Sequence, residues 1–575
     1  MARRRLEAEE LKRWTRDFGA VADILRRLRR GGTIGGRLAA VAVAAALCLG
    51  LASVPGAGAA QPVFQGAYTS FPDYMDPQLS YTAEGWTAMY DVYVPLLTYQ
   101  HAEGLAGAEV IPGLAKALPT ITNDGKTYTL FLRPGLRYSD GTRVRASDFK
   151  RSIERLFKVN SGGAPFYTDI VGARAFWHGK RAHIRGIVPN DRTGKIVIHL
   201  EGPSGTFTNQ LALLFAAPVP PSTPMRDQSY SPPPGTGPYE ITESRPGVGW
   251  RYARNPEWRK SNGPRMPQIP SGHVGRIQIS VIRNQGAQAK YLKEGRLDWL
   301  FDPPTKTQTA AIEAGVGGTQ MRVEPTRSTY YFWLNTQKAP FDDLKVRQAV
   351  EYAVDPEALS LIYSGQLAPT SQILPPDMPG YQAFDLYPHN MQTARKLMRE
   401  ADPKDRDITV WTDSESPNND AGAYYQGVLK ELGFHVSLEV LNADNYFTVI
   451  GSKRTPNLDT GFADWFEDYP HPDDFFEPLF ASKPKPFGNM NFSNLVAADL
   501  NRKVAELAAR PGPIDEAAYA ELDREYMELA PIVPYGTRTL NMAVSREVDL
   551  KGFVWNPTFE SDFATFRFKQ GSATP

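Results

Sequence analysis

Cysteine is almost absent from this sequence of 575 residues. The single cysteine, Cys48, lies within the first 60 residues, so the rest of the chain has none. A disulfide framework, a thiolate metal site and a cysteine nucleophile are therefore excluded for residues 61–575. The sequence also lacks the motifs of phosphate-binding loops, zinc proteases, serine hydrolases and dinucleotide-binding folds, and it has no repeat typical of solenoids or propellers.

Long apolar runs are lacking as well, with one exception near the start of the chain. Residues 38–52 (LAAVAVAAALCLGLA) carry no charge, follow Arg37 and precede the small residues Ala57-Gly58-Ala59. This pattern is typical of a secretory signal, and we expect cleavage after Ala59 or Ala60. An uncleaved anchor is disfavoured, because this stretch spans about 22 Å as a helix and a bilayer core is about 30 Å thick.

A lipid anchor on Cys48 is also disfavoured. A lipidated cysteine normally follows a small residue at the end of the apolar run, whereas Cys48 follows Leu47 inside it. An exported protein without an anchor must be retained by an outer membrane, so we expect a periplasmic protein. The 37 residues before the run are unusually long for a signal. They fit either an amphipathic leader or a start codon assigned too early.

Excess positive charge is missing outside the leader. Residues 1–37 hold eleven Lys and Arg against five Asp and Glu, which leaves 53 against 58, a net −5, for the remainder. A nucleic-acid partner is therefore not expected. Aromatic residues make up 11% of the chain. They indicate either large cores or a pocket lined by rings.

Short segments alternate between strand-like and helix-like patterns after residue 61. This mixture predicts an α/β protein with more than one sheet. The clearest strands are 127–132 (TYTLFL), 195–200 (KIVIHL), 330–334 (YYFWL) and 434–440 (FHVSLEV), and the clearest helices begin at Ser147-Asp148, cover 344–353 and cover 424–432 before Gly433.

Many short motifs then follow one another in a familiar order. They are Asp76-Pro77, Leu96-Leu97, IPGLA at 111–115, YSDGT at 138–142 with Ser147-Asp148-Phe149, GTGPY at 235–239, RNP at 254–256, GRLD at 295–298, LNT at 334–336, PFDD at 340–343, VRQA at 346–349, WFEDYPHP at 465–472 and APIVP at 530–534. Because these motifs occur in this order, the chain resembles the family 5 solute-binding proteins of ABC transporters, which include the periplasmic oligopeptide- and dipeptide-binding proteins.

The resemblance implies a two-lobed α/β periplasmic binding protein (type II, similar to cluster C), with a small domain inserted in lobe I. The leader would cover 1–60. Lobe I would comprise 61–105, 190–325 and 529–575, the inserted domain 106–189 and lobe II 326–528. The chain would pass between the two lobes near Arg327 and near Leu529, and these two connections would act as the hinge.

The resemblance also implies a ligand-binding carboxylate. In peptide-binding relatives the aspartate of the W-x-x-D-Y segment pairs with the ligand's α-ammonium, and the matching residue here is Asp468. A charge-assisted hydrogen bond of this kind strengthens as a closing cleft loses water. Trp465 occupies the position of an aromatic wall and Tyr469 follows the aspartate. Apart from the resemblance, Asp468 fits a capping loop residue and both rings fit core packing.

Five further residues are weaker candidates for ligand binding. Phe166 and Tyr167 lie near a ring position that the inserted domain presents in relatives. Glu84 approximates an acidic pocket residue of the N-terminal segment. Thr412 and Asp413 follow a strand-like segment whose end we expect to face the cleft. No catalytic residue, metal ligand or cofactor is predicted, because lone histidines such as His178 and His471 usually pack or are solvated.

One departure bears on specificity. Oligopeptide binders carry an arginine three residues before the tryptophan, where this chain has Phe462; Lys453 and Arg454 lie nearby in sequence. Oligopeptide specificity is therefore in doubt, and relatives also bind dipeptides, nickel chelates, haem, sugars and opines.

The resulting hypothesis is a monomeric, non-enzymatic receptor. It would close on a peptide or similar small polar solute and dock on an ABC permease, whose ATPase subunits drive transport. Two alternatives stay open. The carboxylates of segment 464–474 would also suit an exported hydrolase that uses paired carboxylates or a hard cation. The second alternative is a periplasmic protein of the same fold that acts in signalling or as a chaperone.

Overall fold

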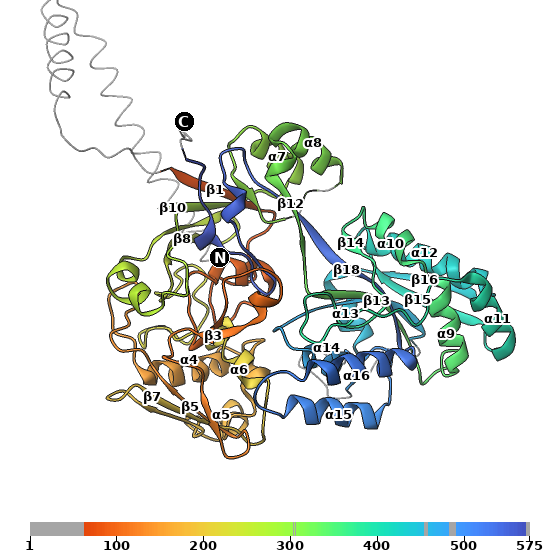
Figure 1. Ribbon diagram of the computed structural model, residues 1–575, viewed down its shortest axis with the longest axis horizontal. Helices are drawn as coiled ribbons and strands as arrows, with labels where there is room; N and C mark the ends of the chain where they lie inside the picture. The colour runs from red at the N-terminus through yellow and green to blue at the C-terminus, as the bar shows by residue number, and fades with distance from the viewer. Residues whose placement is uncertain (1–61, 303, 305, 453–457, 482–489, 571–575) are drawn as a thin grey trace, which may run out of the picture. The chain divides into compact units, whose positions relative to one another are not determined.

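The computed structural model describes residues 62–570 except for 303, 305, 453–457 and 482–489 (Figure 1). The predicted leader, its cleavage site, Lys453 and Arg454 lie outside the described residues. Among the residues described, no helix is long and apolar enough to cross a bilayer.

Within the described residues, the strands form three larger sheets and two small ones. In spatial order, the first sheet contains β11 (Trp299–Leu300), β1 (Val63–Tyr68), β10 (Arg276–Val281), β9 (Gly249–Arg254) and β8 (Tyr239–Arg245). The second contains β12 (Met321–Pro325), β18 (Ile532–Ala543), β13 (Ser328–Leu334), β17 (Thr460–Phe466), β15 (Asp407–Asp413) and β16 (His435–Leu441), and β14 (Leu367–Ala368) also pairs with β18. The third contains β4 (Thr120–Thr122), β5 (Thr127–Phe131), β7 (Lys195–His199) and β6 (Ile187–Asn190), and the two small sheets pair β2 (Leu97–Tyr99) with β3 (Val110–Pro112) and β19 (Trp555–Asn556) with β20 (Glu560–Ser561).

Helices connect most of these strands. In chain order they are α3 (Ala83–Met89), α4 (Ala146–Lys158), α5 (Ala173–Trp177), α6 (Phe207–Gln210), α7 (Gln285–Lys293), α8 (Lys306–Val316), α9 (Leu344–Ala353), α10 (Pro356–Ile362), α11 (Met391–Ala401), α12 (Asn418–Glu431), α13 (Tyr446–Ile450), α14 (Asp473–Phe480), α15 (Ala498–Ala508) and α16 (Glu516–Glu528). The mixture of parallel and antiparallel pairs agrees with the predicted α/β class.

The second sheet is built around β13. Its sequence STYYFWL is buried at every position, and β17 and β18 pair with its two edges. β-Branched and aromatic side chains suit such a buried strand. β16 lies at the sheet edge, and its side chains are exposed or half-buried throughout. The predicted strand at 330–334 is therefore confirmed, with two residues added at its start.

Helix positions also follow the predicted patterns, with one difference. Asp343 caps α9 by accepting a hydrogen bond from the Lys345 amide, and α9 has the predicted bounds. α12 begins at Asn418, six residues before the predicted start, because its first turn is polar and shows little apolar periodicity. The helix ends before Gly433, whose φ of +92° is the left-handed conformation expected there.

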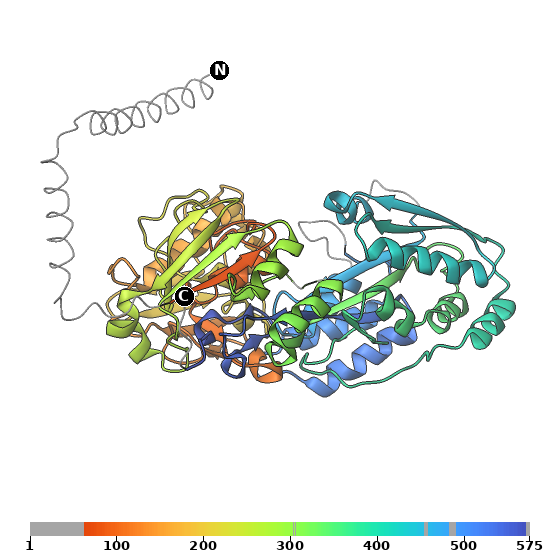
Figure 2. The same cartoon turned by 90° about the horizontal axis from the view of Figure 1, so that it is seen from above.

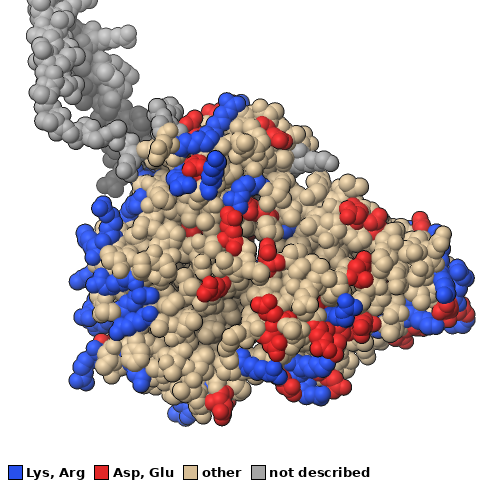
Figure 3. Space-filling view, in the orientation of Figure 1, with Lys and Arg blue, Asp and Glu red and all other residues tan. Residues whose placement is uncertain are grey.

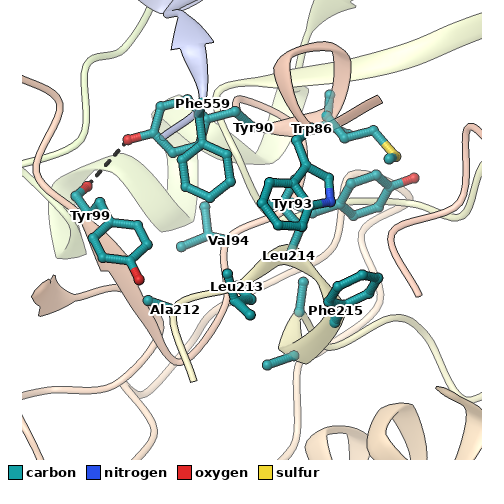
Figure 4. Close-up of a cluster of buried hydrophobic side chains, with 14 of the residues drawn as sticks. Trp86, Tyr90, Tyr93, Val94, Tyr99, Ala212, Leu213, Leu214, Phe215 and Phe559 are labelled. Atoms are coloured by element: carbon teal, nitrogen blue, oxygen red, sulfur yellow. Dashed lines mark hydrogen bonds between the residues drawn. The ribbon is translucent and has the colours of Figure 1, made fainter. Parts of the chain in front are cut away.

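Two hydrophobic cores dominate the molecule. The first combines residues 64–299 with Tyr469 and C-terminal residues 540–566, and the second combines residues 330–535 other than Tyr469. Figure 2 shows the dark-blue C-terminal segment lying among the orange and green elements of the first core. A close-up of this core shows Trp86, Tyr90 and Phe559 packed together, with the Tyr90 hydroxyl donating to the Tyr99 carbonyl (Figure 4). The predicted boundaries between lobes stay predictions.

The Asp76-Pro77 motif has a structural role. The Asp76 carboxylate accepts two hydrogen bonds from the Arg155 guanidinium, at 2.8 and 2.6 Å, and both side chains are fully buried. Arg155 belongs to α4, so this ion pair attaches the N-terminal segment to that helix. A fully buried bidentate pair is costly to break, because the remaining charge has no solvent to hydrate it.

We expect Asp76→Ala to lower the free energy of unfolding by about 3–5 kcal/mol, since Arg155 would be left as a buried charge without its carboxylate. Urea unfolding followed by tryptophan fluorescence measures this change. The matched control is Glu431→Ala, which breaks the exposed Arg395–Glu431 pair and should change stability little. Equal effects of the two substitutions would contradict the structural role of Asp76.

Candidate functional site

A cavity of about 1260 Å³ is the main candidate site. Its walls come from segments that are distant in the sequence: residues 165–174, 203–210, 464–477 and 501–509, together with Tyr81, Phe447 and others. Residues of both hydrophobic cores therefore border the same space. In Figure 3, acidic side chains gather near the middle of the visible face and over its lower right part.

Asp468 lies in the wall of this cavity and is 7% exposed. Its backbone amide donates to the Asp474 carboxylate over 2.6 Å, which fixes the loop between β17 and α14. Its carboxylate accepts a hydrogen bond of 2.7 Å from the Tyr81 hydroxyl, 387 residues earlier in the chain. Burial and the neighbouring Asp468 carboxylate raise the pKa of Tyr81 well above its usual range, so Tyr81 is a hydrogen-bond donor at physiological pH.

Aromatic rings form one side of the cavity. The Phe166 ring meets the Tyr81 and Tyr469 rings edge to face, with both centroid distances at 6.1 Å. Trp465 and Phe447 line the cavity as well. Rings with fixed neighbours give an apolar ligand segment a rigid surface at little cost in conformational entropy.

A buried ion pair stands directly beside Asp468. Glu467 accepts from Arg327 at 3.1 Å and from the Thr558 hydroxyl at 2.7 Å, and both charged side chains are almost fully buried. Arg327 also donates to the Gly104 and Asp377 carbonyls. Burial raises the pKa of Glu467, and the Arg327 charge opposes that shift. These contacts hold the start of the 467–469 loop.

Carboxylates predominate over basic side chains in the cavity wall. Among the described lining residues, five are acidic and Arg174 is the one basic residue; the acids are Asp169, Asp464, Asp468, Asp473 and Glu477. Burial raises the pKa of Asp464 to about 6, with Asp413 adding to the shift and Arg538 opposing it. The wall thus favours a ligand group that carries positive charge.

His471 follows the same loop and is a satisfied buried residue. Its Nδ1 atom accepts a hydrogen bond from the Asp473 amide over 3.1 Å. Burial lowers its pKa to about 3, so the ring stays neutral at physiological pH.

The predicted site residues do not all meet at the cavity. Phe166, Trp465, Asp468 and Tyr469 line it together. Tyr167 is buried behind it, and its hydroxyl donates to the carbonyl of Gln210, a lining residue.

The other three predicted residues have local surroundings. Thr412 is fully buried and donates to the Asn418 carbonyl, while Asp413 accepts from the Glu415 amide and the Asn418 side chain. Both therefore fix the start of α12. Glu84 lies half-buried in the first turn of α3, where burial raises its pKa. None of these three is among the described lining residues.

Tyr81 was not predicted as a site residue, and Asp464 was considered only as one of the carboxylates of segment 464–474. Tyr81 lies three residues before Glu84, in the segment where an N-terminal pocket residue was expected, but a single tyrosine in a loop has no periodicity to mark it. Phe462, which stands where oligopeptide binders carry arginine, is fully buried and stacks on Tyr446. It packs inside the second core and brings no charge to the cavity.

Comparison with known proteins gives a consistent result. Residues 109–487 match the family model described as "Bacterial extracellular solute-binding proteins, family 5 Middle". The "probable di/tripeptide-binding protein 5" of Pseudomonas aeruginosa (strain UCBPP-PA14) is 24% identical over 80% of this chain and 88% of its own length. The glutathione-binding protein GsiB of Escherichia coli O1:K1 / APEC is 24% identical over 69% of this chain and 75% of its own length.

A solved structure shares the fold. The clavulanic acid biosynthesis oligopeptide binding protein 2 superposes with a TM-score of 0.79 at 23% identity, over 88% of this chain and 96% of the other. The predicted fold class, a two-lobed α/β binding protein of this type, is thereby confirmed.

We expect Tyr81→Phe to lower the free energy of unfolding by about 1.5–3 kcal/mol, because a hydrogen bond to a charged acceptor is lost. Chemical denaturation measures this change in the parent protein and in an Asp468→Asn background, where the effect should shrink. Tyr74→Phe, at an exposed tyrosine, is the matched control. An undiminished effect in the Asp468→Asn background would show that the two side chains are not coupled.

Proposed function

The chain belongs to the bacterial extracellular solute-binding proteins of family 5, and from this premise we propose that it is a receptor for small peptides or similar solutes with a free ammonium group. The observation that carries the proposal is the buried Asp468 carboxylate in the wall of a 1260 Å³ cavity. A buried carboxylate on one side and aromatic rings on the other suit a short, partly apolar cation.

The size of the cavity supports a ligand larger than a single amino acid. Pockets for small molecules commonly measure about 300–1,000 Å³, and this one exceeds that range. Two relatives are named for di- and tripeptides and for glutathione, which are ligands larger than a single amino acid. Phe462 supplies no counter-charge for a peptide carboxylate, so we propose that specificity rests on the ammonium end of the ligand.

In the proposed cycle, Asp468 binds the ligand ammonium and the lobes close over it. Closure removes water, which strengthens the ion pair. The closed monomer then docks on a membrane permease whose ATPase subunits drive import. We place the receptor in the periplasm after removal of the leader at Ala59 or Ala60. We further propose that the ligand is released unchanged, because the carboxylates beside Asp468 serve structural roles: Glu467 pairs with Arg327, and Asp474 fixes the Asp468 amide.

Native mass spectrometry of the purified protein tests this assignment first. A bound series of short peptides would support the proposal and reveal the preferred length. A single mass that matches a sugar or a metal chelate would retain the receptor but overturn peptide specificity. Incubation with identified peptides, followed by mass spectrometry, should recover them intact; cleavage products would instead indicate a hydrolase.

We expect Asp468→Ala to weaken binding of di- and tripeptides with free amino termini by about 2–5 kcal/mol, since the buried ammonium loses its counter-charge. Isothermal titration calorimetry measures the change. N-acetylated versions of the same peptides should bind weakly to both proteins. Asp499→Ala, at an exposed carboxylate of α15, is the control and should bind normally. Unchanged affinity of Asp468→Ala would remove this residue from the site.

Binding should also depend on pH through Asp464. Its pKa is raised to about 6, so the carboxyl is mostly neutral at pH 5 and charged at pH 7. A cationic peptide therefore gains attraction as the pH rises, by up to about tenfold in affinity if the interaction is worth one pKa unit. Titrations from pH 5 to 7 should show this rise, and Asp464→Asn should flatten it. A pH profile that is identical in the variant would contradict the role of Asp464.

A further inference from the structure

Three metal-ligand side chains meet in the first core, away from the cavity. Asp91 follows α3, His101 follows β2, and Asp562 follows β20 near the end of the chain. One potential ligand atom from each lies within 4.8 Å of the other two. The residues are separated by up to 471 positions in sequence, so the cluster joins the N-terminal and C-terminal parts of the first core.

Backbone contacts orient the two carboxylates. The Ala564 amide donates to Oδ2 of Asp91 over 2.9 Å and to Oδ1 of Asp562 over 3.0 Å. Oδ2 of Asp562 and Nδ1 of His101 form a hydrogen bond of 2.7 Å with each other, and Oδ1 of Asp91 lies near both. Oδ1 of Asp91 is buried and has no hydrogen-bond partner among the described residues.

Burial makes this arrangement costly without a further positive charge. Asp91 is 3% exposed, the Asp562 side chain is fully buried, and the His101 side chain is 4% exposed. Among the described residues, His101 is the one basic group in ion-pair range of either carboxylate. Two buried carboxylates therefore face at most one positive charge, and buried charges need pairing or metal coordination.

The imidazole ring is held in a fixed orientation. It stacks on the Tyr90 ring with a centroid distance of 4.5 Å and an interplanar angle of 19°, and Tyr90 stacks in turn on Phe559 (Figure 4). The Ala564 amide that both carboxylates share is a hydrogen bond of the kind that second shells supply to metal-ligating carboxylates.

We propose that Asp91, His101 and Asp562 bind a divalent transition-metal ion such as Zn²⁺ or Mn²⁺. Two carboxylate oxygens and one imidazole nitrogen are a ligand set that these ions accept. Charge also balances, since a dication neutralises two carboxylates beside a neutral imidazole. The ion has a structural role: it clamps residues 91–101 to the 562–564 segment independently of ligand binding in the cavity.

Metal analysis of the full chain tests the proposal. Protein purified with a tag that binds no metal is stripped with EDTA, incubated with Zn²⁺ or Mn²⁺, desalted and measured by inductively coupled plasma mass spectrometry. We expect one ion per chain, and a thermal midpoint that falls on stripping and recovers on refilling. His101→Gln should lower metal affinity by at least about tenfold. Asp91→Asn should abolish the metal-dependent shift in the thermal midpoint.

The control variant is His435→Gln, at an exposed histidine paired with Asp407, which should retain the ion and the thermal shift. Equal metal content in the parent protein and in Asp91→Asn would overturn the proposal. So would an Asp91→Asn variant that is more stable than the parent while neither protein responds to metal. That result would show that the two carboxyl groups share a proton instead, since asparagine mimics a protonated aspartate.

Discussion

The loop that carries Asp468 depends on the buried ion pair between Arg327 and Glu467. Arg327 lies between β12 and β13, where the chain passes toward the second core, and Glu467 directly precedes Asp468. The same two side chains contact Gly104 and Thr558 of the first core. A pair this deeply buried has few alternative arrangements, because any loss of geometry leaves a charge without solvent. The position of Asp468 therefore depends on contacts from three other segments of the chain, at residues 104, 327 and 558.

Much of the fold could be predicted from the sequence, because local patterns matched local structure. The apolar run of β13 and the capped pattern of α9 are strong signals, and both elements formed where expected. The start of α12 could not be predicted, because its polar first turn has no apolar periodicity. The fold class rested on the order of many weak motifs, several of which prove structural, as the buried Asp76–Arg155 pair illustrates.

The site was predictable only in part, for a physical reason. One short sequence motif contains Trp465, Asp468 and Tyr469, and all three residues line the cavity. Tyr81 reaches the same carboxylate from 387 residues away, and such a contact depends on packing that no local pattern encodes. Thr412 was predicted to face the ligand, but it is not among the described lining residues, and its hydroxyl donates to the Asn418 carbonyl at the start of α12.

The participation of residues 540–566 in the first core has a consequence for biogenesis. Strand β18 pairs with β13 through its first half and with β12 through its second half, and the segment after it completes the packing around Phe64 and Trp299. The first core therefore cannot close until nearly the whole polypeptide has emerged, and contacts of such long sequence separation form slowly. The first core is thus completed last, after the residues that build the second core have been made.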